Sequence, residues 1–115
     1  MSDECLFCQI ASRKIASDIV YEDDDVVAFT DISPGAPTHL LVVPRRHIAS
    51  LNDLKPEDGE LLGKMVSTGA TLAKQRSLDD GGYRLVINTG RDAGQTVDHI
   101  HLHLLGGRSL SWPPG

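Results

Sequence analysis

The sequence predicts an α+β fold in a single domain over residues 1–115, built from an antiparallel sheet of about five strands, one long helix and one short helix. Three observations carry this prediction. Short β-branched or aromatic runs recur between turn residues, one longer stretch has apolar residues at helical spacing, and the run nearest the C-terminus alternates with a period of two. A chain of 115 residues can bury one hydrophobic core but not two.

Each expected element has a local reason. Strands are predicted at 19–21, 26–29, 39–43, 83–88 and 99–105, with the first pair forming a hairpin around an acidic connection and the last pair lying side by side, antiparallel. Apolar spacing predicts a short helix over 5–13, begun by Ser2 or Asp3, and a long helix from Pro56 to near Arg76. The turn at 33–37 holds two prolines and a glycine, and Pro44 ends the third strand.

Composition excludes several classes of protein. A net charge of -5 repels a phosphate backbone, so we expect no nucleic-acid binding. The first residues are acidic, and no apolar run has the length of a signal peptide or a membrane span, so we expect a cytoplasmic protein without membrane contact. The basic pair Arg45 and Arg46 is interpreted as a solvated strand end rather than a binding patch.

The two cysteines, Cys5 and Cys8, form a C-x-x-C pair. In a reducing compartment this spacing favours a thiol or metal role over a structural disulfide. Redox activity is a weaker alternative, because no βαβ pattern surrounds the pair.

Three histidines, His99, His101 and His103, alternate with apolar residues near the C-terminus. A strand would place all three imidazoles on one face and the apolar residues on the other. Imidazole can act as a nucleophile or a general acid or base near neutral pH, and it also ligates metals, so the triple by itself leaves both chemistries open.

A glycine-containing loop at 88–96 precedes the histidines and favours binding of an anion. Its glycines can expose backbone N–H groups, and Gln95 and Thr96 add side-chain donors. Such a loop is a weak signal alone, but next to the histidines it indicates a phosphate cradle beside a nucleophile.

The chain resembles the histidine-triad (HIT) superfamily, and within it the Hint branch of nucleotide-binding phosphoramidases. The resemblance runs from residue 5 to residue 115, and its motifs occur in order along the chain. They are Asp31-Ile32-Ser33-Pro34, Ala36-Pro37-Thr38-His39, Val43-Pro44, Asn88, Gly94-Gln95-Thr96, the three histidines, Gly106-Gly107-Arg108 and Trp112-Pro113-Pro114-Gly115.

The resemblance implies a purine nucleoside phosphoramidase that cleaves a P–N bond through a nucleotidyl-histidine intermediate. His101 would be the nucleophile, His103 its charge-stabilising partner and His39 the histidine that supports the site. Thr96 would complete the catalytic set, and the phosphate oxygens would be bound by Asn88, Gly94, Gln95 and Thr96. Thr96 replaces a serine of the best-known members, and Asp98 stands where an aromatic residue usually precedes the triad.

The same resemblance implies a nucleoside pocket. Asp31 would bind both ribose hydroxyls, and Thr30 would lie beside the nucleotide. The apolar base pocket would be formed by Phe7, Ile10, Phe29 and Ile32. Ordinary core packing is the alternative for these apolar residues, above all for Ile10 and Phe29.

Two further implications concern metal and assembly. Cys5, Cys8, His47 and His99 match the ligands of the zinc-containing members, and two thiolates with two imidazoles suit a tetrahedral structural zinc. The family fold is a two-layer α+β unit whose sheet continues across a homodimer, and the C-terminal tail would reach the partner's site.

Three rival functions remain open. A dinucleoside-polyphosphate hydrolase or nucleotidyltransferase would use the same His101 but usually lacks the ending at 106–115. A nucleotide-sensing adaptor would keep the pocket without turnover, which the intact triad disfavours. A zinc-stabilised interaction module would bind no AMP or GMP at all.

Overall fold

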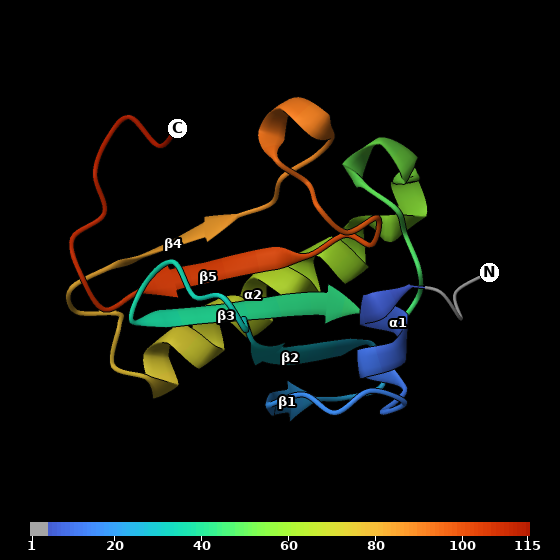
Figure 1. Ribbon diagram of the computed structural model, residues 1–115, viewed down its shortest axis with the longest axis horizontal. Helices are drawn as coiled ribbons and strands as arrows, with labels where there is room; N and C mark the ends of the chain where they lie inside the picture. Colours follow the sequence, from blue (N-terminus) through green and yellow to red (C-terminus); the bar gives the residue numbers. More distant parts are fainter. Residues whose placement is uncertain (1–4) are drawn as a thin grey trace.

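The structure, a computed structural model, describes residues 5–115 and contains one five-stranded antiparallel sheet. Its strands are β1 (Ile19–Glu22), β2 (Val26–Thr30), β3 (Thr38–Pro44), β4 (Tyr83–Val86) and β5 (Leu102–Gly106), in the spatial order β1-β2-β3-β5-β4. The helices are α1 (Leu6–Ala11) and α2 (Gly59–Gln75). The predicted α+β class, with about five strands and a short and a long helix, is confirmed (Figure 1).

The long helix α2 covers one face of the sheet, behind β3 and β5 in the view of Figure 1. The face beneath it carries alternate residues of three strands, and with the helix they form the main core. Its fully buried members include Val26, Ala28, Leu40, Val42, Met65, Ala73 and Leu104. Burial of this apolar surface is the main force that holds the helix on the sheet. Across residues 5–115, no helix is long and apolar enough to span a membrane.

The opposite face of the sheet holds a second core beneath α1. Phe7 and Ile10 of the helix are buried against Phe29 and Leu41 of the strands. The antiparallel register aligns Phe29 with Leu41, and Leu41 with His103, in one row across three strands. Because directly paired residues share a face, His103 lies on the α1 side of the sheet.

The helices begin and end slightly inside their predicted bounds. In α1, Cys5 is the N-cap and its thiol accepts a hydrogen bond from the Cys8 N–H, while Arg13 already has a φ of 63°. The predicted start at Ser2 or Asp3 lies outside the described residues. In the long helix, Pro56 begins a separate 3-10 turn (Pro56–Asp58) before α2.

The last strand was predicted to start at His99, and this is wrong: β5 begins at Leu102. Its register pairs Val42 with Leu102, so an extended ladder would set Pro44 opposite Ile100. Proline has no N–H to continue the ladder. The Ile100 N–H instead donates to the carbonyl of Ile48 at 2.7 Å. β4 ends at residue 86, not 88; in its register with β5, residue 88 would pair with His101, which lies before β5 begins.

Candidate active site

The rings of His101 and His103 are neighbours, and the Phe7 ring contacts both His101 and His99, although only His103 of the triad lies within β5. Ring centroids of His101 and His103 are 5.0 Å apart, and the edge of Phe7 packs against His101 at 5.0 Å and against His99 at 6.0 Å. The predicted clustering of the imidazoles on one side is therefore present. It arises from the chain that leads into the strand as well as from the strand itself.

His101 is buried and held in one orientation by the backbone. Its Nδ1 lies 2.8 Å from the carbonyl oxygen of His99, which can only accept a hydrogen bond. Nδ1 must therefore carry a proton, and in the neutral form of the ring the lone pair is on Nε2. A neutral imidazole with a free, oriented Nε2 is the form required of a nucleophile.

A chain of hydrogen bonds also fixes the tautomers of His39 and His103. The Gly35 N–H donates to His39 Nδ1 at 2.9 Å, so the His39 proton is on Nε2. That Nε2–H donates to His103 Nδ1, again at 2.9 Å. His103 must then carry its own proton on Nε2.

The Nε2–H of His103 is a buried donor without a hydrogen-bond partner among the described residues. Burial, together with His101 and His39 nearby, lowers the pKa of His103 from 6.5 to about 4, so its ring is neutral at pH 7. A buried donor without a partner costs free energy unless a ligand supplies an acceptor. This atom is therefore the expected contact for an anionic oxygen.

A cavity of about 460 Å³ opens on the α1 side of the sheet. Seven of the residues predicted to bind nucleotide line it: Phe7, Ile10, Phe29, Thr30, Asp31, Ile32 and Thr96. Phe7, Ile10 and Phe29 also belong to the second core, so they pack in the fold and line the cavity at once, and their contact with a base stays a prediction. Ile32 is 93% exposed at this cavity, and an apolar side chain in that position is available to cover a flat ligand.

Asp31 joins the cavity to the histidines. Its Oδ1 accepts the Ser33 N–H at 2.7 Å, and its Oδ2 lies 3.4 Å from His39 Nε2. One carboxylate oxygen is thus oriented by the turn while the side chain lines the cavity. The position suits a group that accepts hydrogen bonds from hydroxyls.

Several N–H donors of the predicted phosphate cradle already make hydrogen bonds to backbone carbonyls. The N–H groups of Gly94 and Gln95 donate to the carbonyls of Arg91 and Gly90. The Gln95 side-chain amide donates to Ala49 O and Val97 O and accepts the Gly90 N–H. Thr96 is the residue of this loop that reaches the cavity.

Asn88 lies two residues beyond the end of β4, at the start of that loop. It is partly buried, and it does not line the cavity described above. Its phosphate-binding role, like those of Gly94 and Gln95, stays a prediction.

Cys5, Cys8, His47 and His99 come together at the N-terminal end of α1, and their donor atoms all lie within 4.8 Å of one another. Cys8 Sγ is 3.4 Å from both His47 Nδ1 and His99 Nδ1, Cys5 Sγ is 3.3 Å from His99 Nδ1, and the two Nδ1 atoms are 3.2 Å apart. The four residues predicted as metal ligands therefore form one group.

The group fits a tetrahedral ion. Zinc bond lengths of about 2.3 Å to sulfur and about 2.0 Å to nitrogen place a sulfur and a nitrogen ligand roughly 3.5 Å apart, and two nitrogen ligands roughly 3.3 Å apart. The Sγ–Nδ1 and Nδ1–Nδ1 distances given above are close to these values. The His99 Nε2 lies 2.8 Å from the carbonyl of Pro44, which fixes the proton there and turns the Nδ1 lone pair toward the thiols. Burial lowers the pKa of His99, which favours the neutral ligand form.

Several residues of the cavity were not predicted from the sequence. Leu6, Ile15, Leu41 and Val97 also line it. Leu6 is an exposed apolar residue on α1 and Val97 directly follows the cradle, so both lay next to predicted positions. Ile15 had no signal, since it follows the helix in an irregular segment.

Together these features define a class of protein, one in which an apolar cavity carrying a carboxylate lies beside an oriented imidazole and a buried N–H donor. Comparison with known proteins agrees. A family model described as scavenger mRNA decapping enzyme C-term binding matches residues 4–111. The chain belongs to the HIT family.

Individual relatives are similar over almost the whole chain. A HIT-like protein of Synechococcus elongatus is 52% identical over 100% of both chains. The purine nucleoside phosphoramidase of Escherichia coli K12 is 51% identical over 96% of this chain and 92% of its own. The crystal structure of a HIT family hydrolase from Legionella pneumophila superposes with a TM-score of 0.96 at 51% identity, covering 97% of this chain and all of that one. This chain is thus an enzyme of the hydrolase class.

Proposed function

We propose that this protein is a purine nucleoside phosphoramidase, which hydrolyses the P–N bond of adenosine or guanosine 5′-phosphoramidates. The observation that carries the proposal is the pairing of His101, whose Nε2 lone pair is free, with His103, whose buried Nε2–H lacks a partner. A nucleophile and an oxyanion donor are the two groups that phosphoryl transfer needs from the protein. The similarity to the phosphoramidase of Escherichia coli supports the choice of bond.

In this mechanism the nucleoside lies in the cavity, with Asp31 binding the ribose hydroxyls and the apolar walls enclosing the base. His101 Nε2 attacks the phosphorus and a new N–P bond forms. The leaving nitrogen takes the electron pair of the old P–N bond and a proton from solvent, so it departs as a neutral amine. His103 Nε2–H stabilises the charge on the phosphoryl oxygens. Thr96, which reaches the cavity, binds a remaining oxygen. For Gly94 and Gln95 to bind the others, they would have to give up the hydrogen bonds to backbone carbonyls that they make here, and Asn88 would have to move to the cavity. Water then displaces His101 and releases the nucleoside monophosphate.

The metal group is proposed to hold a structural Zn²⁺, since all four positions of a tetrahedron would be filled by Cys5, Cys8, His47 and His99. When bound, the ion would link α1 to the chain entering β5. Thiolate ligands persist in a reducing compartment, which supports a cytoplasmic location.

A homodimer is also proposed. β4 is an edge strand, and an edge with unpaired backbone groups can pair with a second copy. In the C-terminal tail, Trp112 is 79% exposed, with the guanidinium of Arg84 5.8 Å from its ring centre. Arg84 also donates to the carbonyl of Ser111 at 3.0 Å, so the tail is fastened to this edge. Light scattering should give twice the chain mass of 12.4 kDa.

The deciding experiment is a hydrolysis screen of adenosine and guanosine phosphoramidates against dinucleoside polyphosphates, with His101→Ala as the control. Fast release of amine and nucleoside monophosphate from the phosphoramidates supports the proposal. Preferred cleavage of the polyphosphates would replace it with the polyphosphate hydrolase. AMP binding without turnover of any substrate would indicate the nucleotide-sensing adaptor.

A further inference from the structure

Arg45, one residue beyond Pro44 at the end of β3, makes three hydrogen bonds through its guanidinium. Nε donates to the carbonyl of Asp23 at 2.6 Å, Nη1 to the carbonyl of Ala11 at 2.8 Å, and Nη2 to the carboxylate of Glu22 at 2.8 Å. The side chain is only 33% exposed. The expectation of a solvated strand end is therefore wrong for this residue, because its charge is used inside the fold.

These partners belong to two different elements. Glu22 and Asp23 lie at the hairpin between β1 and β2, and Ala11 is the last residue of α1. A cation at a helix C-terminus also interacts favourably with the helix dipole and with carbonyls that have no partner within the helix. Arg45 thus fastens the C-terminal end of α1 to the hairpin and to the end of β3.

The segment that contains Arg45 also positions the two imidazoles of the metal group. His47 is two residues further on, and the carbonyl of Pro44, one residue earlier, fixes His99. The thiol half, Cys5 and Cys8, is on α1. The guanidinium therefore links the element bearing the thiols to the segment bearing the imidazoles.

The same helix forms a wall of the proposed nucleotide cavity. Phe7 and Ile10 line the cavity from α1, and the edge of the Phe7 ring packs on His101. Any shift of α1 relative to β3 would move this wall and the support of the nucleophile together.

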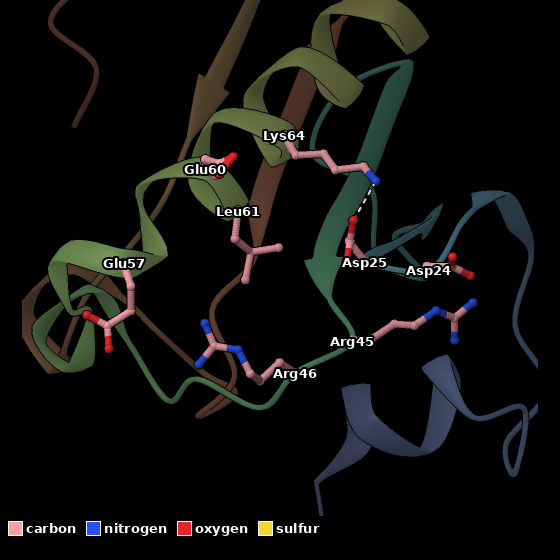
Figure 2. Close-up of a pocket in the computed structure, with 8 residues that line it drawn as sticks. All are labelled: Asp24, Asp25, Arg45, Arg46, Glu57, Glu60, Leu61 and Lys64. Atoms are coloured by element: carbon pink, nitrogen blue, oxygen red, sulfur yellow. Dashed lines mark hydrogen bonds and ion pairs between the residues drawn. The ribbon is translucent and has the colours of Figure 1, made fainter.

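Two neighbouring arginines differ from Arg45. Figure 2 shows the guanidinium groups of Arg45 and Arg46 pointing in opposite directions, with Arg46 on the side where α2 begins. There Arg46 pairs with the buried Asp58, and its own side chain is 58% exposed. Arg13 contacts the same Glu22 as Arg45 but is 62% exposed. Among the hydrogen bonds found within residues 5–115, neither arginine reaches the carbonyl of Ala11.

We propose that Arg45 is a positioning residue, which sets the place of α1 and thereby both the spacing of the metal-ligating group and the shape of the nucleotide cavity. Its planar guanidinium group donates hydrogen bonds to three acceptors in fixed directions. A lysine would keep the charge but could not reproduce that geometry. The nucleotide part of this inference depends on the proposed function, whereas the part concerning α1 does not.

The test compares Arg45→Met and Arg45→Lys with the controls Arg46→Met and Arg13→Met, each in the full chain. Arg46→Met removes an ion pair to a buried carboxylate, so it controls for a general loss of stability. Three quantities are measured well below the unfolding temperature: hydrogen exchange of the α1 amides, the rate at which a chelator removes Co²⁺ followed by its visible absorption, and the dissociation constant for AMP.

For Arg45→Met we expect about 10-fold faster exchange in α1, about 10-fold faster metal release and about 5-fold weaker AMP binding, by analogy with residues that orient metal ligands. Arg45→Lys should recover less than half of each loss. Both controls should stay within about twofold of the parent protein, even where they unfold at a lower temperature.

Exchange, metal release and AMP affinity within twofold of the parent protein in Arg45→Met would overturn the proposal, as would equal effects in Arg46→Met. If Arg45→Met does not fold, Arg45→Lys decides by the same criteria. If the parent protein binds no AMP, the proposed function fails, while the exchange of α1 still decides the role of Arg45.

Discussion

His103 allows a test that separates the roles of its two ring nitrogens. Its Nδ1 accepts from His39, and its Nε2–H is the buried donor without a partner. Asparagine places an oxygen near the Nδ1 position, whereas glutamine places an amide nitrogen near the Nε2 position. His103→Asn therefore keeps the link to His39, and His103→Gln keeps the donor.

The expected magnitudes follow from which atom is lost. A donor held in place for transition-state charge is worth about 3 kcal/mol, or about 10²–10³ in kcat. His103→Asn should lose that amount with a small change in KM. His103→Gln loses only the bond that orients the ring, so a loss of about 10-fold is expected.

The assay is steady-state hydrolysis of adenosine 5′-phosphoramidate at pH 7, where a His103 pKa of about 4 keeps the parent ring neutral. AMP binding and thermal unfolding of both variants serve as controls. A greater loss in His103→Gln than in His103→Asn, with both variants folded, would refute the assignment of the Nε2–H as the catalytic donor.

Three further predictions concern the nucleophile, the ribose and the pH dependence of stability. His101→Gly should abolish hydrolysis while calorimetry still detects AMP binding, and a near-parental rate would contradict the mechanism. Asp31→Ala should weaken AMP binding far more than 2′-deoxy-AMP binding, and equal losses would remove Asp31 from the ribose site. Because the pKa of His103 falls from 6.5 to about 4 on folding, the unfolded chain binds more protons between these values. The free energy of unfolding should therefore fall by at most about 3.4 kcal/mol as pH drops through this window, and by less in His103→Gln.

The metal group gives a fifth prediction. Elemental analysis should find about one zinc per chain, and chelation should lower the unfolding temperature more than the hydrolysis rate at moderate temperature. A variant with Cys5→Ser and Cys8→Ser should unfold at lower temperature. Protein made with ample zinc but containing none would reject the site.

Much of the sheet was predictable because its signals are local. Alternating burial in β5 and the apolar runs of β2 and β3 follow from side chains that a sequence displays directly. The start of β5 was not predictable. The ladder stops where Pro44 would have to pair, and the position of that pair depends on the register between strands distant in sequence. Register is set by packing of the whole sheet.

The candidate site was predictable to a similar extent. Residue types and spacing pointed to the triad and to the C-x-x-C pair, and the family resemblance added His47 and His99 to the metal-ligating set. The four residues of that set do come together. The tautomers of His39 and His103 could not be anticipated, since they depend on which backbone groups face each ring. Arg45 was misjudged because a charged residue after a strand is usually exposed, and its three acceptors lie in other segments.

The hydrogen bond from Gly35 to His39 means that the protonation pattern of the site is imposed by a peptide group, not by a side chain. Almost any residue at position 35 could supply the same N–H, and a Cβ added there would be 3.8 Å from His39 Nδ1, an ordinary contact. Only proline lacks the hydrogen. Gly35→Ala should therefore be silent in catalysis. Gly35→Pro should leave His39 free to exchange its proton between its two ring nitrogens. The proton of His103 would then no longer be fixed on Nε2.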